Sequence, residues 1–415
     1  MQPHRPDVLP AGARDLTVPR ISARTLGNSG FLFVNNHVRD YPMPGRENFQ
    51  VTIKLPGDKS VTLPSKPITL PADAYFVWPF NMDLSGLHLR FATAQPLAIL
   101  GTAAAPVYAF VAQPNIPAEF IIDDQPGLKL DSSQAIGLTT TRHDGALWLR
   151  DQPPGPTEQL RFTLSSGRSV ALLLIRQEDA EDAWKIASHG TTDLLLTTEQ
   201  VSIDDTATLT NLGSDNFGAQ VLATSSLLRP VDPKVKFRSI RSGLMAGSPT
   251  DNPTTLLLTT TQTKPADAPA SLPADFKPSN RPRIVAAAPT EADWSRAATY
   301  SIPLPKSALT DTPTEQYFLR ITYTGDIARL STNGHLLDDN FADNRPWLVG
   351  LTRFAPQLTQ SGGKLTLSIY PLRPNPPIFF EPGHEPKPDT PPASLQSVEL
   401  LTQYTLKLKM VTKKP

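Results

Sequence analysis

Two apolar stretches decide the fold of this chain: Gly30-Phe31-Leu32-Phe33-Val34-Asn35-Asn36-His37 and Tyr75-Phe76-Val77-Trp78-Pro79-Phe80-Asn81-Met82-Asp83-Leu84. Between them, residues 51–55 alternate apolar and polar side chains, which is the period-two pattern of a half-buried strand. Residues 56–59 read Pro-Gly-Asp-Lys, which is typical of a turn, and residues 61–63 resume the strand. The region therefore predicts consecutive strands joined by tight turns.

The composition favours an all-β protein with many loops. The 415 residues are enough for two to four domains, and 39% hydrophobic residues can supply real cores. Proline stands out, because 44 residues is about twice the average share of roughly 5%. Proline breaks helices and the central strands of sheets, so short apolar runs between prolines indicate strands connected by loops.

Charge and cysteine content narrow the possible functions. The 39 basic and 39 acidic residues cancel, which argues against a surface for nucleic acid or for an anionic membrane. The absence of cysteine excludes disulfides and thiolate sites. No apolar run reaches the roughly 18 residues of a membrane-spanning helix, and residues 1–10 lack the apolar centre of a signal peptide. Either the protein stays in the cytoplasm or the start of a longer secreted protein is missing, so the localisation stays open.

The strand pattern predicts an all-β fold of two to three β-sandwich or jelly-roll modules with one short helix. The helix is expected near residues 178–188, where acidic residues crowd the first turn and suit the helix dipole. The predicted parts are an extended segment (1–24), a first β-sandwich module (25–150), a second β module (151–262), a proline-rich linker (263–283) and a jelly roll (284–415).

Four stretches stand out in order along the chain. The first two are residues 30–36 and 75–83, and the third is the predicted helix with Ala180, Ala183, Trp184 and Lys185. The fourth is residues 323–330, followed by Asn333-Gly334, residues 337–341 and Arg345-Pro346-Trp347. In this order they resemble the segment that follows the catalytic barrel in bacterial family 35 glycoside hydrolases, the β-galactosidase family. This last group, with residues 371–373 and 404–408, is similar to the galactose-binding-like jelly roll near the end of these enzymes. The resemblance spans about residues 20 to 410.

The resemblance implies a β-galactoside substrate class but no catalytic residue in this chain. Family members hydrolyse with retention, using two glutamates about 5 Å apart on a barrel of roughly 250 residues. Neither glutamate context nor the barrel pattern is present, so no catalytic residue and no cofactor is carried over. The parent enzyme is implied to be periplasmic or secreted.

Three functions follow from these observations. The leading prediction is a non-catalytic accessory portion of a β-galactosidase, which packs on a catalytic barrel polypeptide supplied by another chain. The alternative is a free-standing carbohydrate-binding module for galactosides. The third is an independent hydrolase on a β fold, which has no carboxylate motif behind it.

The candidate sugar contacts fall in two places. One is a group of polar and aromatic residues near the predicted hairpin at Asn333-Gly334, and the other is an isolated tryptophan. Oxygen side chains at 338–340 could bind calcium or sugar hydroxyls, whereas the competing structural role is turn capping with the following tryptophan in the core. The seven histidines lack the spacing of a zinc helix. The candidates are Asn333, Asp338, Asp339, Asn340, Arg345, Trp347 and Trp148.

Overall fold

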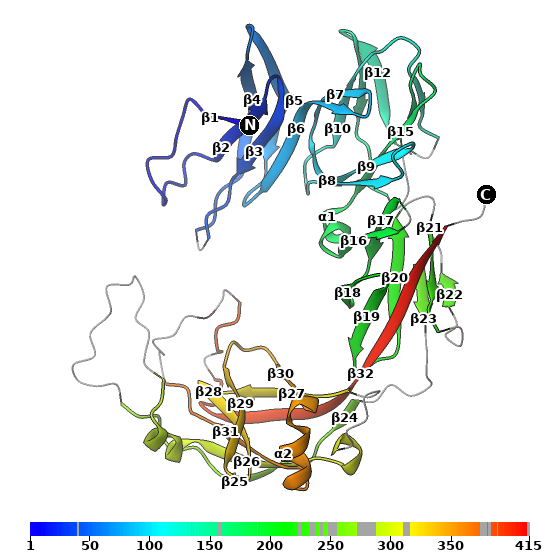
Figure 1. Cartoon of the computed structure of the whole chain (residues 1–415). Helices are drawn as coiled ribbons and strands as arrows, with labels where there is room; N and C mark the ends of the chain where they lie inside the picture. The colour runs from blue at the N-terminus through cyan, green and yellow to red at the C-terminus, as the bar shows by residue number, and fades with distance from the viewer. Residues whose placement is uncertain are drawn as a thin grey trace. The chain divides into compact units, whose positions relative to one another are not determined.

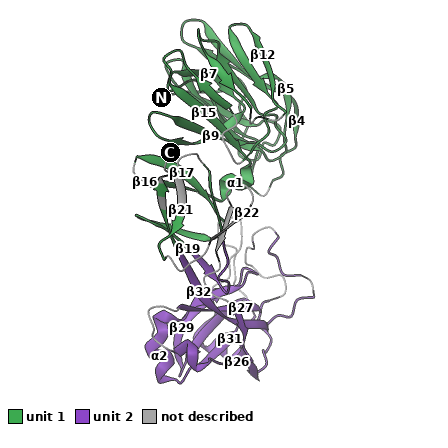
Figure 2. Ribbon diagram, turned by 90° about the vertical axis from the view of Figure 1, so that its right-hand side faces the viewer, with its two compact units in different colours: residues 1–209, 218–247, 407–415 green, residues 210–217, 248–406 purple. Residues whose placement is uncertain are grey.

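The chain is an all-β protein, as the sequence predicts. The computed structural model has 56% of its residues in strands and 7% in helices. It describes residues 1–39, 41–133, 135, 137–155, 160–188, 190–222, 226–232, 237–240, 244–247, 255–271, 288–309, 316–373, 380, 383–387 and 389–412. The chain is drawn in Figure 1, and contacts divide it into two compact units (Figure 2). Unit 1 comprises residues 1–209, 218–247 and 407–415, and unit 2 comprises residues 210–217 and 248–406.

The first part of the chain, up to residue 150, consists of strands. They are β1 (Gln2–His4), β2 (Arg20–Leu26), β3 (Ser29–Asn35), β4 (Arg46–Leu55), β5 (Lys59–Leu70), β6 (Tyr75–Leu84), β7 (Leu87–Ala92), β8 (Ala94–Gly101), β9 (Pro106–Ala112), β10 (Glu119–Asp123), β11 (Lys129–Asp131), β12 (Thr139–His143) and β13 (Ala146–Arg150).

The middle part, up to residue 264, adds more strands and the first helix. They are β14 (Leu160–Thr163), β15 (Ser169–Ile175), α1 (Gln177–Glu181), β16 (Ala183–Ser188), β17 (Thr191–Leu196), β18 (Gln200–Ile203), β19 (Ala207–Leu212), β20 (Phe217–Leu222), β21 (Ser226–Pro230), β22 (Phe237–Ile240), β23 (Leu244–Gly247), β24 (Thr255–Leu257) and β25 (Thr261–Lys264).

The last part mixes strands with short helices, three of them 3-10 helices labelled η. They are η1 (Glu291–Arg296), β26 (Ala298–Pro303), η2 (Lys306–Leu309), β27 (Gln316–Thr324), β28 (Ile327–Thr332), β29 (His335–Phe341), β30 (Trp347–Gly350), η3 (Thr352–Phe354), α2 (Ala355–Gln360), β31 (Lys364–Ile369) and β32 (Ser394–Thr412).

Unit 1 is built around one sheet that a hairpin covers on one face and a second sheet covers on part of the other face. Its described strands run in the order β1-β2-β3-β6-β7-β10-β13-β12, and a second sheet runs β11-β14-β15-β9-β8-β17-β20-β23-β22. The β4–β5 hairpin packs on one face of the first sheet, around buried Trp78 and Phe80. The second sheet packs on the other face, where Phe110 meets Phe120 edge to face with ring centroids 5.2 Å apart. Aromatic pairs of this kind add to the stability that burial supplies.

Close packing requires a glycine at residue 30, the first residue of β3's apolar stretch. A methyl group on Gly30 would overlap the carbonyl oxygen of Arg24 on β2 and lie 2.8 Å from the ring of Phe80 on β6. The three strands pair side by side, with Gly30 registered against Thr25 and Phe80. The absence of a side chain at residue 30 therefore lets β2, β3 and β6 come together.

Unit 2 is a sandwich of antiparallel sheets. One sheet pairs β27 with β30 and with the first part of β32, and β24 pairs with the other edge of β32. The facing sheet has the order β25-β26-β31-β28-β29. Leu319, Leu367 and Leu400 belong to the single core between the sheets, so the jelly-roll or sandwich character expected for this region is confirmed.

The predicted helix near residues 178–188 is wrong in its extent. Helix α1 ends at Glu181, and residues 183–188 form β16, which pairs residue by residue with β17. A helix of five residues is marginal on its own, and pairing with β17 outweighs the helical propensity of alanine and lysine. Helix α2, with proline in its first turn, was not predicted at all.

The module boundaries also differ from those expected. Residues 151–155 do not separate two modules, because β14 and β15 join the sheet that contains β9, with β15 parallel to β9. Residues 263 and 264 of the expected linker belong to β25, which pairs with β26. The linker residues from 272 onward lie outside the described residues.

Candidate functional site

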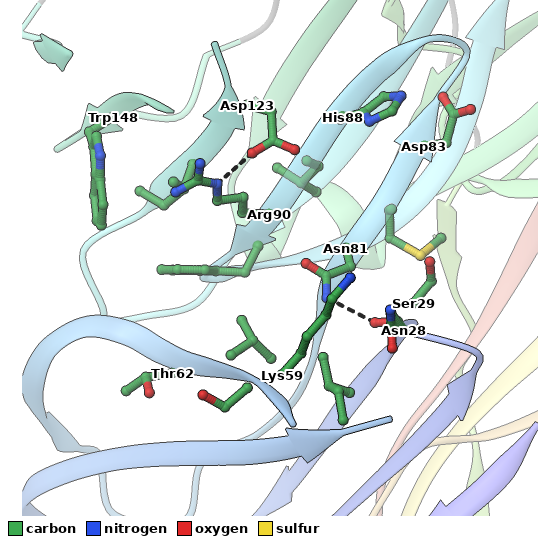
Figure 3. A pocket seen from close by; sticks show the side chains of 17 residues that line it. Asn28, Ser29, Lys59, Thr62, Asn81, Asp83, His88, Arg90, Asp123 and Trp148 are labelled. Carbon is green, nitrogen blue, oxygen red and sulfur yellow. Dashed lines mark hydrogen bonds and ion pairs between the residues drawn. The ribbon is translucent and has the colours of Figure 1, made fainter. Parts of the chain in front are cut away.

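A cavity of about 980 Å³ in unit 1 lies where the β4–β5 hairpin stops covering the first sheet. Residues 59–62 at the hairpin turn form one wall, and Asn28 and Ser29 of the β2–β3 turn form another. The remaining walls come from β6, β7, β10 and β13 (Figure 3). The cavity is thus lined by residues from seven strands (β3, β4, β5, β6, β7, β10 and β13) and from the β2–β3 turn of a single unit.

A left-handed residue in β6 creates one side of the cavity. Trp78 and Phe80 point into the core under the hairpin, whereas Leu84 of the same strand points into the core on the opposite face. Side chains two or four residues apart on a regular strand share a face. The exchange occurs at Asn81, whose φ of 48° is left-handed. Strained backbone of this kind is concentrated at functional sites.

Strand β7 changes face at the matching position. Leu89 belongs to the core against the second sheet, whereas Phe91 belongs to the core under the hairpin. The register between β10 and β7 shifts at this point, so Arg90 is the extra residue of a β-bulge. Bulges re-aim side chains, and here the bulge places Arg90 in the cavity (Figure 3).

Arg90 is held in place from two directions. Its Nε donates to Asp123 Oδ1, and its second terminal nitrogen donates to the carbonyl oxygens of Asp144 and Gly145 at 3.0 and 2.9 Å. Asp144 and Gly145 form the tight turn between β12 and β13, and both have positive φ. The guanidinium is therefore fixed by a charge-assisted hydrogen bond and two backbone acceptors.

The amides of the cavity are fixed as well. Asn81 Nδ2 donates to the carbonyl oxygen of Asn28 at 2.8 Å, which joins β6 to the β2–β3 turn. Asn28 Oδ1 is buried and has no hydrogen-bond partner among the described residues. Lys59, Asp83 and His88 also line the cavity, and Asp83 and His88 face each other as a registered pair across β6 and β7.

Trp148 lies at the end of the cavity away from Asp83 in the view of Figure 3. The imidazole of His143 stacks on its indole, with centroids 4.4 Å apart and an angle of 11° between the planes. The guanidinium of Arg150 lies 4.8 Å from the indole centroid. His143 on β12 is registered against Ala146 of β13, two residues before Trp148, and Arg150 lies two residues after Trp148 on the same strand. The two side chains therefore flank the indole ring on both sides. Trp148 therefore lines the wall and does not present a free face.

Arg150 is supported by a buried carboxylate. Glu119 is only 6% exposed and accepts hydrogen bonds from the backbone nitrogen and the hydroxyl of Ser65, at 2.7 and 2.6 Å. Arg150 Nε lies 3.7 Å from Glu119 Oε2, and its terminal nitrogen donates to Ser65 Oγ at 3.3 Å. This network ties β5 of the hairpin to β10 and β13.

The acidic candidates from the sequence lie in unit 2, on β29 and not in a loop. Asn333 occupies the left-handed position of the β28–β29 turn, with φ of 47°. Asp338 forms an ion pair with Arg353, and Asp339 is its exposed neighbour. Adjacent residues of a strand point to opposite faces, so the structure does not bring Asp338 and Asp339 together as ligands of one ion.

The other candidates of unit 2 already have protein partners. The amide of Asn340 donates to the Tyr323 hydroxyl, which in turn donates to the Asn340 carbonyl oxygen, at 2.9 and 3.1 Å. Burial raises the pKa of the Tyr323 phenol. Arg345 lies 3.2 Å from His384 Nε2. Trp347 is 7% exposed and meets Tyr323 edge to face within the sandwich core, so its ring faces the protein interior.

The described residues show neither a metal site nor a membrane-spanning helix. Within the described ranges, no three histidine, aspartate or glutamate side chains come together as a metal site. No helix in the described part of the chain has the length and apolar character needed to cross a membrane.

Sequence reasoning found only Trp148 among the residues of the cavity. Asp123, which ends β10 and anchors Arg90, was not among the candidates. The exchange of the buried face at Asn81 is not visible in the sequence, because Phe80 and Leu84 are both apolar and each enters a core.

A scan against protein-family models finds no match to this chain, and a search of curated proteins finds none either.

Proposed function

We propose that the chain is the non-catalytic accessory portion of a family 35 β-galactosidase, and that it packs on and shapes a catalytic barrel supplied by another chain. The motivation is the ordered resemblance over about residues 20 to 410 together with the missing barrel pattern. The all-β architecture is consistent with this proposal. The observation that carries it is an exposed aromatic surface on β3 and β6, the strands formed by the first two of the four stretches.

This aromatic surface consists of the rings of Phe33 and Tyr75 together with the aliphatic side chain of Val77, on the outer face of β3 and β6. Phe33 is registered against Val77, and Tyr75 lies two residues before Val77, so the three side chains are neighbours on one face. Tyr75 is 64% exposed and Phe33 is 37% exposed, whereas the alternate residues of both strands are buried. Exposed apolar groups that cluster in this way mark interaction sites.

The chemistry of the aromatic surface suits a protein partner. The Tyr75 ring lies beside the His37 imidazole, with centroids 6.0 Å apart, and β8, which contacts β6, carries exposed Leu97 and Ile99. Tyrosine and phenylalanine are enriched in protein interfaces, where they bury a large area and satisfy a polar tip. A barrel polypeptide of the β-galactosidase family is the partner to which the resemblance points.

Co-expression with a family 35 barrel polypeptide encoded beside this chain tests the proposal. We expect the two chains to co-purify, and we expect the Phe33→Ser/Tyr75→Ser double variant to weaken association at least tenfold, since aromatic anchors dominate interfaces. Leu257→Ser is the matched control, because Leu257 is 67% exposed on β24 in the other unit. Failure to associate, or equal association of the double variant and wild type, contradicts the proposal.

A further inference from the structure

We propose that the cavity around Asn81 and Arg90 binds a neutral carbohydrate through its hydroxyl groups. This inference goes beyond the proposed assembly with a barrel, because it concerns the isolated chain. It rests on the size of the cavity, on polar side chains that are held in place but keep free hydrogen-bonding capacity, and on the balance of charged side chains in the lining.

The cavity has the dimensions and the mixed lining of a small-molecule site. Its volume of about 980 Å³ lies at the upper end of the range of roughly 300–1,000 Å³ that such sites occupy. Leu55, Phe91 and Ile121 supply buried apolar wall, and amides, carboxylates, hydroxyls and cations supply the rest. A sugar presents the same mixture of C–H faces and hydroxyl edges.

The polar groups are already positioned. Arg90 and Asp123 hold each other, and Asn81 is fixed by its bond to Asn28. Each retains hydrogen-bonding capacity: only one carboxylate oxygen of Asp123 meets Arg90, and the Asn81 bond uses only its amide nitrogen. Groups fixed before binding lower the entropy cost of binding.

The balance of charge favours a neutral ligand over an anion. Lys59 and Arg90 bring two positive charges, and Asp83 and Asp123 bring two negative charges. A phosphate or carboxylate site would show an excess of donors. Hydroxyl groups both donate and accept, so they can meet the amides, carboxylates and cations of this cavity together.

The test combines calorimetry with nuclear magnetic resonance on the full-length chain. The probes are galactose and lactose as neutral sugars, with glucuronate and inorganic phosphate as anions. We expect heat of binding for the neutral sugars and a shift of the Trp148 indole N–H resonance, which is identified by its loss in Trp148→Phe. No heat and no shift with either neutral sugar overturns the proposal, and so does tighter binding of phosphate or glucuronate.

Two pairs of variants locate the site. Asn81→Gly removes the amide and keeps a residue that accepts left-handed φ, and Asn48→Gly makes the same change at φ of 57° on exposed β4, away from the cavity. We expect Asn81→Gly to weaken sugar binding about tenfold and Asn48→Gly to leave it unchanged. Lys59→Gln should weaken binding severalfold, whereas Lys66→Gln, on the same hairpin but outside the cavity, should not. Sugar binding that is equal in Asn81→Gly, Lys59→Gln and wild type places the ligand elsewhere and overturns the proposal.

Discussion

Asn81 and Arg90 lie opposite each other across β6 and β7, between the registered pairs Phe80–Phe91 and Met82–Leu89. Both strands exchange their buried face at this position, Asn81 through its left-handed φ and Arg90 through a bulge. Because β6 and β7 change their buried face at the same position, their backbone pairing continues before and after Asn81 and Arg90. The two polar side chains are left at the edge of the hairpin-covered face, where the cavity forms.

The left-handed conformation of Asn81 predicts a difference between two substitutions. Both Asn81→Gly and Asn81→Ala lose the bond to Asn28, but only alanine meets the steric penalty of positive φ. We expect Asn81→Ala to lower the free energy of unfolding by about 1–2 kcal/mol more than Asn81→Gly does. Urea denaturation of the two variants measures this, and equal stability would show that residue 81 is not left-handed.

The close packing at Gly30 predicts a large effect of a small change. A methyl group there meets the backbone oxygen of Arg24, which cannot move without disturbing the pairing of β2 with β3. Gly30→Ala should lower the free energy of unfolding by about 1–3 kcal/mol. Gly12→Ala is the control, because open space surrounds Gly12. Thermal unfolding that ranks the two variants equally would argue against this packing.

The hydrogen bonds of the buried Glu119 carboxylate predict that the attachment of the β4–β5 hairpin to the sheet depends on this residue. Glu119→Ala leaves the Ser65 donors and Arg150 without their acceptor, and should lower the free energy of unfolding by about 2–3 kcal/mol. Ser65→Ala removes only one hydroxyl donor and should cost about 1 kcal/mol. Chemical denaturation of both variants checks the order. A smaller loss for Glu119→Ala than for Ser65→Ala would be inconsistent with this network.

The ion pair between Arg320 and Glu399 predicts a dependence on pH. Arg320 donates to both carboxylate oxygens, at 2.7 and 3.0 Å, and these hydrogen bonds lower the pKa of Glu399. The stability it contributes is therefore present above the ordinary glutamate pKa of about 4.3 and is lost as the pH falls through the lowered value.

The partly exposed pair is expected to contribute about 0.5–1 kcal/mol at neutral pH. Glu399→Gln should thus be less stable than wild type at neutral pH, and the two unfolding free energies should converge in strong acid. Glu47→Gln, at an exposed position of β4, serves as the control. A difference between Glu399→Gln and wild type that stays constant with pH would exclude a contribution from this ion pair.

The sequence predicts the strands of this protein well, because the local pattern coincides with the structure. The turn at residues 56–59 connects β4 to β5, and Asn333-Gly334 connects β28 to β29, both with left-handed residues where the turn chemistry requires them. The helix prediction failed after Glu181, where the partner strand β17 lies next in the chain and decides the structure. Such pairing is not visible in a local window.

The cavity could not be predicted, for a physical reason. A change of face usually shows as a break in the alternation of apolar residues. Here β7 contributes to a core on each side of the sheet, so Leu87, Leu89 and Phe91 continue the alternation without a break. Arg90 and Asp123 are 33 residues apart and meet only after β7 and β10 pair. By contrast, the unit 2 candidates were selected by residue type, and several of them already have partners within their own sheet or core.

The central claim is the proposal that this chain assists a catalytic barrel and does not itself catalyse hydrolysis. The hydrolysis of a nitrophenyl β-galactoside tests this claim most directly. The rate is measured for the pure chain, for the barrel polypeptide alone and for the two together. We predict no turnover by the pure chain, and higher activity or thermal stability of the barrel when the chain is present. Turnover by the pure chain at enzymatic speed, or a barrel whose activity and stability are unaffected by it, would contradict the account.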